Sequence, residues 1–168
     1  MDSKANTVRR TPGSPVDLDD RDRKLLGLLS EDASLSYAEL GERISLSAPA
    51  VHERVKRLKR DGVIQATVAR IDGCRIGRSL LAFVHVDTVG WGASGPFLEM
   101  SAEPDVEEVH TVAGDACLIL KVRCVDAQAL ETLLERIYTF EGVRGTRTYI
   151  ALSTYVERGP QPVIAAAD

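Results

Sequence analysis

The residues best suited to binding chemistry in this chain are basic side chains gathered in one short segment, Ser47–Arg60. At about 100° per residue, Val51, Val55 and Leu58 fall on one face of a helix. The opposite face carries a polar and basic set, with His52 on its flank: Pro49, Glu53, Lys56, Arg57 and Arg60. Such a run of charge is also compatible with an ordinary solvated helix face. Its meaning therefore depends on the elements that position it.

Those elements predict a helix-turn-helix. Ser36 followed by Glu39 is a capping box that begins a short helix, and the apolar spacing of Tyr37, Leu40 and Ile44 predicts one buried face. A tight turn follows, after which Ser47 is a good N-cap and Pro49 falls in the first turn of the next helix. Gly62 stands where a left-handed C-terminal cap is expected. A further helix over 19–31, leucine-rich and acidic at its start, completes a three-helix unit.

This arrangement favours binding of double-stranded DNA, with the second helix in the major groove. We expect the small N-terminal turn of that helix, formed by Ser47, Ala48 and Pro49, to approach base edges and thymine methyl groups. The side chains expected to reach the groove are His52, Glu53, Lys56 and Arg57. Lys59 and Arg60 are better placed for phosphates.

Charge is divided unevenly along the chain. Of 168 residues, the first 70 hold 13 Lys and Arg against 11 Asp and Glu, and the remainder holds 8 against 14. A weakly basic DNA-binding domain joined to an acidic second domain needs several copies of the chain to multiply its contacts with DNA. No apolar run approaches the roughly 20 residues of a membrane span, so a cytoplasmic protein without membrane contact is expected. The three cysteines lack metal-ligand spacing, and no metal or cofactor is expected.

The second half of the chain predicts an α+β fold. Strands are expected over 80–87, 106–113, 117–124 and 143–152, with helices over 95–102 and 126–140. This βαββαβ order is the ferredoxin-like arrangement, an antiparallel sheet with both helices on one side. A further strand over 63–71 is expected to lead out of the helix-turn-helix domain.

The strand over 80–87 predicts a second copy of the chain. Its even positions are wholly apolar and should face the helices, but Leu81 and Phe83 fall on the other face. No helix of this chain covers that face. Packing against the same face of another subunit is the simplest way to bury it, so a dimer through this domain is expected.

Four segments together resemble one family. LDDRDRKLLGLLSEDA (18–33), LSAPAVHERVKRLKRDGVI (46–64), VHTVAGDACLILKV (109–122) and GVRGTRTYIAL (142–152) resemble the Lrp/AsnC transcription regulators, in the expected order. The resemblance implies a helix-turn-helix joined by a strand linker to a ferredoxin-like, RAM-type domain. It also implies dimers that assemble into tetramers, octamers or larger discs. The expected boundaries are a disordered arm (1–16), the DNA-binding domain (17–62), the strand linker (63–79), the effector-binding and oligomerisation domain (80–156) and a tail (157–168).

The resemblance places a small effector, commonly an amino acid, near the turn between the second and third strands of that domain. The residues implied here are Thr111, Ala113, Gly114, Asp115, Ala116 and Cys117. Backbone N–H groups at such a turn bind a carboxylate, and an acidic side chain binds an ammonium. Cys117-Leu118 stands where the family commonly has Asp-Tyr, so this chain lacks a second carboxylate at the turn. Two alternatives to an amino acid therefore stay open, a more apolar ligand or no ligand. Gly114-Asp115 is also compatible with an ordinary hairpin turn.

The sequence leaves two alternatives to a regulator that responds to an effector. One is an architectural protein that bends DNA with little sequence preference and no effector. The other is an enzyme built on the ferredoxin-like half, but the sequence has no nucleophile elbow, phosphate loop or metal cluster. We therefore expect a regulator and not an enzyme.

Overall fold

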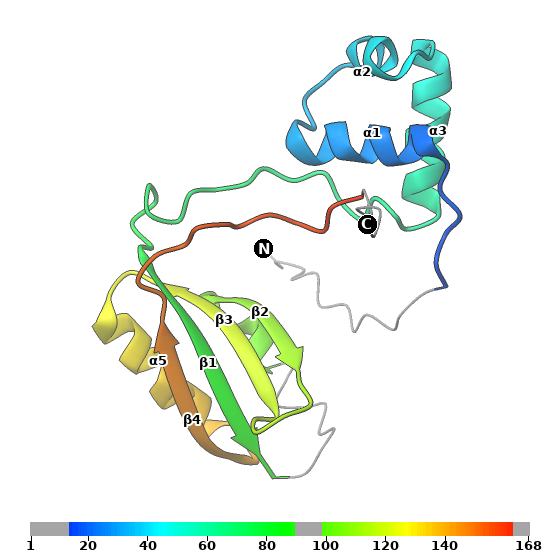
Figure 1. Ribbon diagram of the computed structural model, residues 1–168. Helices are drawn as coiled ribbons and strands as arrows, with labels where there is room; N and C mark the ends of the chain where they lie inside the picture. The colour runs from blue at the N-terminus through cyan, green and yellow to red at the C-terminus, as the bar shows by residue number, and fades with distance from the viewer. Residues whose placement is uncertain (1–13, 90–98, 163–168) are drawn as a thin grey trace. The chain divides into compact units, whose positions relative to one another are not determined.

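The computed structural model describes residues 14–89 and 99–162, which divide into two compact units (Figure 1). Among the described residues, one unit contains the three N-terminal helices together with residues 156–162, and the other contains residues 71–89 and 99–155. No helix among the described residues is long and apolar enough to cross a membrane. The arm expected over 1–16 lies mostly outside the described residues.

The first unit is formed by α1 (Asp20–Glu31), α2 (Tyr37–Ile44) and α3 (Ala48–Arg60). Each helix begins where a side chain binds the amides that the helix leaves unpaired. Asp19 caps α1, Ser36 caps α2 and Ser47 caps α3, and the capping box between Ser36 and Glu39 is present in both directions. Gly62 has a φ of 72°, which confirms the left-handed stop after α3.

The core of this unit follows the apolar stripes expected from the sequence. Its buried side chains are Leu25, Leu40, Ile44, Val51, Val55 and Leu58. Tyr37 was expected in the buried face of α2 but is exposed. Its ring lies instead beside the imidazole of His52, with 5.3 Å between the ring centroids.

The strand expected over 63–71 is wrong. Residues 65–72 have no regular secondary structure, and residues 73–77 form a turn. Val63 and Ile64 belong to the helical unit, where they pack at the edge of its core. The β-branched composition favours extended backbone, but a strand also needs a neighbour to accept its hydrogen bonds. The described part of this chain supplies no such neighbour.

The second unit is a four-stranded antiparallel sheet of order β2-β3-β1-β4. The strands are β1 (Leu80–Thr88), β2 (Val106–Thr111), β3 (Leu118–Cys124) and β4 (Val143–Ile150). They confirm the expected order of strands along the chain, but β2, β3 and β4 are shorter than expected. Figure 1 shows α5 (Ala127–Thr139) lying across one face of the sheet.

Both helical segments cover that same face. The residues buried beneath α5 come from β1 and β3, and Met100 joins the same core with Leu133 and Ile137. Residues 99–102 are helical, and the predicted beginning of that helix lies outside the described residues. The predicted inward set in β1 is confirmed, since Ala82, Val84 and Val86 are fully buried. The fold is therefore the expected ferredoxin-like arrangement attached to a helix-turn-helix.

Candidate DNA interface and effector turn

The helix-turn-helix presents α3 because α2 and the turn are packed very closely. A Cβ added to Gly41 would lie 2.4 Å from the carbonyl oxygen of Leu46, so only glycine fits at this point of α2. Ser45 closes α2 in the left-handed region, with a φ of 55°. Its backbone N–H donates to the carbonyl of Gly41. The turn thereby fixes the direction of α3, whose polar face remains exposed.

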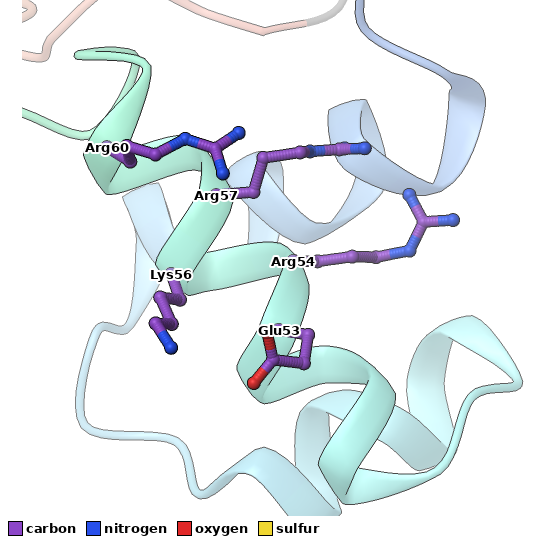
Figure 2. A pocket seen from close by; sticks show the side chains of 5 residues that line it. All are labelled: Glu53, Arg54, Lys56, Arg57 and Arg60. Carbon is purple, nitrogen blue, oxygen red and sulfur yellow. The ribbon is translucent and has the colours of Figure 1, made fainter.

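That polar face forms an open hollow of about 560 Å³ (Figure 2). The side chains that line it are Glu53, Arg54, Lys56, Arg57 and Arg60. Four of the five are cations, so the surface suits the polyanionic backbone of DNA. Pro49, His52 and Lys59 are exposed on the same helix. Arg54 belongs to this surface, although it was absent from the residues predicted to bind DNA.

Two of these arginines are held from below by a buried carboxylate. Asp22 of α1 is 1 % exposed and is the only buried charged side chain among the described residues. Its Oδ1 accepts a hydrogen bond from Arg54 Nη1 at 2.7 Å, and its Oδ2 accepts one from Arg57 Nη2 at 2.5 Å. Arg54 Nη1 also donates to Asp19 at 2.7 Å. In Figure 2, Arg54 and Arg57 extend in one direction from α3, and Lys56 extends in another.

Asp19 joins the helix cap to this network. Its Oδ1 accepts from the backbone N–H of Asp22 at 2.7 Å, and its Oδ2 accepts from Arg54. These bonds lower the pKa of the Asp19 carboxyl, the N–H of Asp22 first and Arg54 second. The carboxylates of Asp19 and Asp22 in turn raise the pKa of the Arg54 guanidinium. Asp19 and Asp22 at the start of α1 therefore position side chains of α3, a relationship that no local sequence pattern predicts.

The predicted effector turn lies between β2 and β3 in the second unit. Its ends are joined because the N–H of Val112 donates to the carbonyl of Cys117 at 3.1 Å, and the N–H of Cys117 donates to Val86 of β1 at 3.2 Å. Gly114 and Asp115 are exposed at its tip, with the Asp115 side chain 85 % exposed. Ala116 is buried beneath it. The turn is both a hairpin connection and an accessible surface.

Arg147 of β4 brings a cation to this turn. Its Nη2 donates to the backbone carbonyl of Asp115 at 3.0 Å. The same nitrogen lies 3.5 Å from the Asp115 carboxylate and 3.7 Å from the carboxylate of Asp87 on β1. Neither Arg147 nor Asp87 was predicted as a site residue, because both come from strands far from the turn in sequence. Together they provide one cation and two carboxylates at one place.

Cys117 closes the turn as a partly exposed thiol. Hydrogen bonding with Thr88, through the side chain first and the backbone second, lowers the pKa of the Cys117 thiol. Burial has the opposite effect on Cys124, whose thiol pKa is raised. The described residues contain no group of three or more His, Cys, Asp or Glu side chains that could hold a metal ion.

The face of the sheet away from α5 carries a mixed apolar and polar surface. Register places Phe83 of β1 between Lys121 of β3 and Tyr149 of β4, and His85 between Ile119 and Arg147. Phe83 is 39 % exposed and Tyr149 is 56 % exposed. The rings of His85 and Tyr149 lie 5.0 Å apart between centroids.

The fold and these surfaces define a class, a helix-turn-helix protein with a separate ferredoxin-like domain. Two family models match the chain in the same division. Residues 18–65 match a winged helix-turn-helix DNA-binding model, and residues 82–161 match the Lrp/AsnC ligand binding domain.

Named relatives agree with both matches. The leucine-responsive regulatory protein of Salmonella typhimurium is 37 % identical over 149 residues, 86 % of this chain and 89 % of that protein. The HTH-type transcriptional regulator FL11 of Pyrococcus horikoshii is 31 % identical over 88 % of this chain and 98 % of its own.

Solved structures give the same answer. The leucine response regulatory protein LrpA of Mycobacterium tuberculosis is 38 % identical, with a TM-score of 0.73 over 86 % of this chain and all of that one. AsnC of Escherichia coli shares the fold at 24 % identity, with a TM-score of 0.81 over 88 % of this chain. The chain belongs to the Lrp/AsnC family of transcriptional regulators. It is a DNA-binding regulator with a ligand-binding domain and not an enzyme.

Proposed function

We propose that this regulator binds its operator as a dimer through α3 of both copies, and that an amino acid bound at the 111–117 turn changes its affinity for DNA. The observation that carries the DNA half is the exposed basic face of α3, held on a buried apolar stripe. Lys56 and Arg60 face the phosphates, and His52 and Glu53 approach the bases. Membership of the family supports this function over a purely architectural role. A regulator that binds the chromosome acts in the cytoplasm, and we propose that location for this chain.

The effector proposal rests on the charges around the turn. Arg147 is placed to bind the carboxylate of an amino acid, and Asp115 with Asp87 to bind its ammonium group. Asp87 supplies the second carboxylate that Cys117 does not provide. Thr111, Ala113 and Gly114 complete the surface, with Ala116 buried beneath them. Cys117 offers an apolar contact to a ligand side chain. Relatives named leucine-responsive support an apolar amino acid.

Subunit assembly completes the proposal. The sheet face that contains Phe83 and Tyr149 is the part of the ligand-binding domain that α5 leaves uncovered. Packing it against the same face of a second copy covers both at once, as a two-fold axis requires. The effector turn stands at the end of the sheet, where further dimers assemble into a tetramer or an octamer.

Thermal shift measurements with single amino acids test the effector site. A ligand at 100 times its Kd stabilises the folded protein by about 2.7 kcal/mol, which is readily measured. We expect an apolar amino acid to raise the melting temperature of the wild type and to lose this effect in Asp115→Ala and Asp87→Ala. Glu131→Ala, an exposed carboxylate on α5, is the matched control. Equal stabilisation of all four proteins would exclude the turn as the site.

A further inference from the structure

Asp22 gives the DNA-binding surface a feature that helix-turn-helix geometry does not require. Five basic side chains lie on α3, and two of them, Arg54 and Arg57, bind this one buried carboxylate. Asp22 also completes the capping box of α1, because its Oδ2 accepts from the N–H of Asp19 at 3.2 Å. Both of its oxygens are therefore occupied, and its position is fixed by the first turn of α1.

The other cations of α3 are held differently. Arg60 binds Asp61 at 2.9 Å, but its side chain is 73 % exposed, so water competes for that pair. Lys56 and Lys59 are exposed. An ion pair with a carboxylate removed from water is screened far less than one at the surface. The Arg57 side chain is 41 % exposed, but its partner Asp22 is buried, so its guanidinium is held on α1 more firmly than Arg60 is held on Asp61.

We propose that Asp22 is a positioning residue that limits the sequence-independent, salt-dependent affinity for DNA, by keeping Arg54 and Arg57 off the phosphate backbone. Phosphate contacts raise the affinity for every sequence equally, whereas base contacts discriminate. With two guanidinium groups held on Asp22, the cations at the phosphates are Lys56, Lys59 and Arg60. The affinity for DNA of any sequence stays low, and the base-contacting side chains in the N-terminal half of α3 decide which sequence is bound. The inference rests on DNA binding by α3.

Asp22→Asn is the direct test, because it keeps the shape and removes the charge. Arg54 keeps Asp19 in this variant, so the guanidinium released is mainly that of Arg57. Binding is measured across a range of salt concentrations on two duplexes, one enriched by the wild-type protein from a random pool and one of random sequence. We expect the salt slope on the random duplex to steepen by about one, and affinity at 0.1 M salt to rise up to about eightfold. The affinity for the enriched duplex should rise by about the same factor, because a phosphate contact forms with either sequence, so the ratio of the two affinities should change little.

Asp20→Asn is the matched control, since it removes the same charge from an exposed position in the same turn of α1. It should change the slope on the random duplex much less, because it releases no guanidinium. Arg57→Gln in the Asp22→Asn background should return the slope to that of the wild type. Thermal melting of each variant reports whether it is folded.

Two results would overturn the proposal. One is an Asp22→Asn protein that melts like the wild type and binds both duplexes with unchanged slopes. The other is a slope on the random duplex that falls by about one in Arg57→Gln alone, since Arg57 would then already contact a phosphate in the wild type. This second variant decides the question even where Asp22→Asn fails to fold. Failure of the random pool to enrich any duplex would instead contradict operator recognition itself.

Discussion

Arg147 donates a hydrogen bond from Nη2 to the backbone carbonyl of Asp115 at 3.0 Å, and so ties β4 to the tip of the turn between β2 and β3. The two residues are 32 positions apart in the sequence. An effector carboxylate that binds Arg147 through Nη2 would compete with this bond. Binding would thereby change how the turn is held, at the place where dimers are proposed to meet.

Arg147→Ala should loosen the turn without unfolding the sheet. Loss of a half-exposed hydrogen bond is worth about 1 kcal/mol or less, which corresponds to at most about fivefold faster amide exchange. Hydrogen exchange measured by NMR should show this at Val112 and Cys117, with the amides of β1 unchanged. Arg144→Ala, an exposed arginine on the same strand, is the control. Identical exchange in both variants would show that Arg147 does not hold the turn.

Lys56→Ala should weaken DNA binding and reduce the magnitude of the salt slope by about one, because one phosphate contact is lost. Fluorescence anisotropy over a salt series measures both quantities. Lys24→Ala removes the same charge from an exposed position on α1 and should leave the slope nearly unchanged. Equal slopes in Lys56→Ala and the wild type would place Lys56 away from the backbone.

The stability of the helical unit should fall in acid through Asp19. The folded state lowers the pKa of its carboxyl below the ordinary 3.8, so the ionised form is favoured by folding. This contribution is present above the ordinary value and is lost as pH falls through the lower folded value. Urea unfolding followed from about pH 6 to about pH 3 should show a flatter curve for Asp19→Asn than for the wild type. Asp17→Asn is the control, and a curve as steep in Asp19→Asn as in the wild type would contradict the assignment.

Phe83→Asp should separate the proposed dimer. A charge at the centre of the uncovered sheet face would have to be removed from water in the pair, which is unfavourable even beside Lys121. Light scattering should give the mass of one chain for this variant, and of the dimer or a larger assembly for the wild type. Val125→Asp changes an exposed apolar residue outside the sheet face and should keep the wild-type mass. An unchanged mass for Phe83→Asp would exclude this face as the interface.

Cys117 should report on the effector site through its reactivity. Its lowered thiol pKa favours the reactive thiolate, whereas burial raises the pKa of Cys124. In a Cys74→Ser background, iodoacetamide should therefore alkylate Cys117 much faster than Cys124, as mass spectrometry of peptides would show. An amino acid that stabilises the protein should slow the reaction at Cys117. If such a ligand leaves the rate unchanged, it binds elsewhere.

The sequence by itself determined the elements and the order in which they occur. Caps such as Ser36 with Glu39 act across three residues, and apolar stripes such as Val51, Val55 and Leu58 act within one helix. Such short-range rules do not depend on the rest of the fold, so the helix-turn-helix and the alternation of β1 were predictable. The basic face of α3 followed from the same rules, and the proposed effector turn followed from resemblance to a family.

Only the tertiary structure decided which charges these surfaces offer. Asp22 meets Arg57 across 35 residues of sequence, and Arg147 meets Asp115 across 32. Such pairs form because apolar packing brings α1 to α3, and β4 to β1, and no local pattern records that approach. The strand predicted over 63–71 is missing for the same reason, since a strand is completed by a neighbour rather than by its own residues. Arg57 was therefore read from the sequence as a groove contact, and the fold turned its guanidinium toward Asp22.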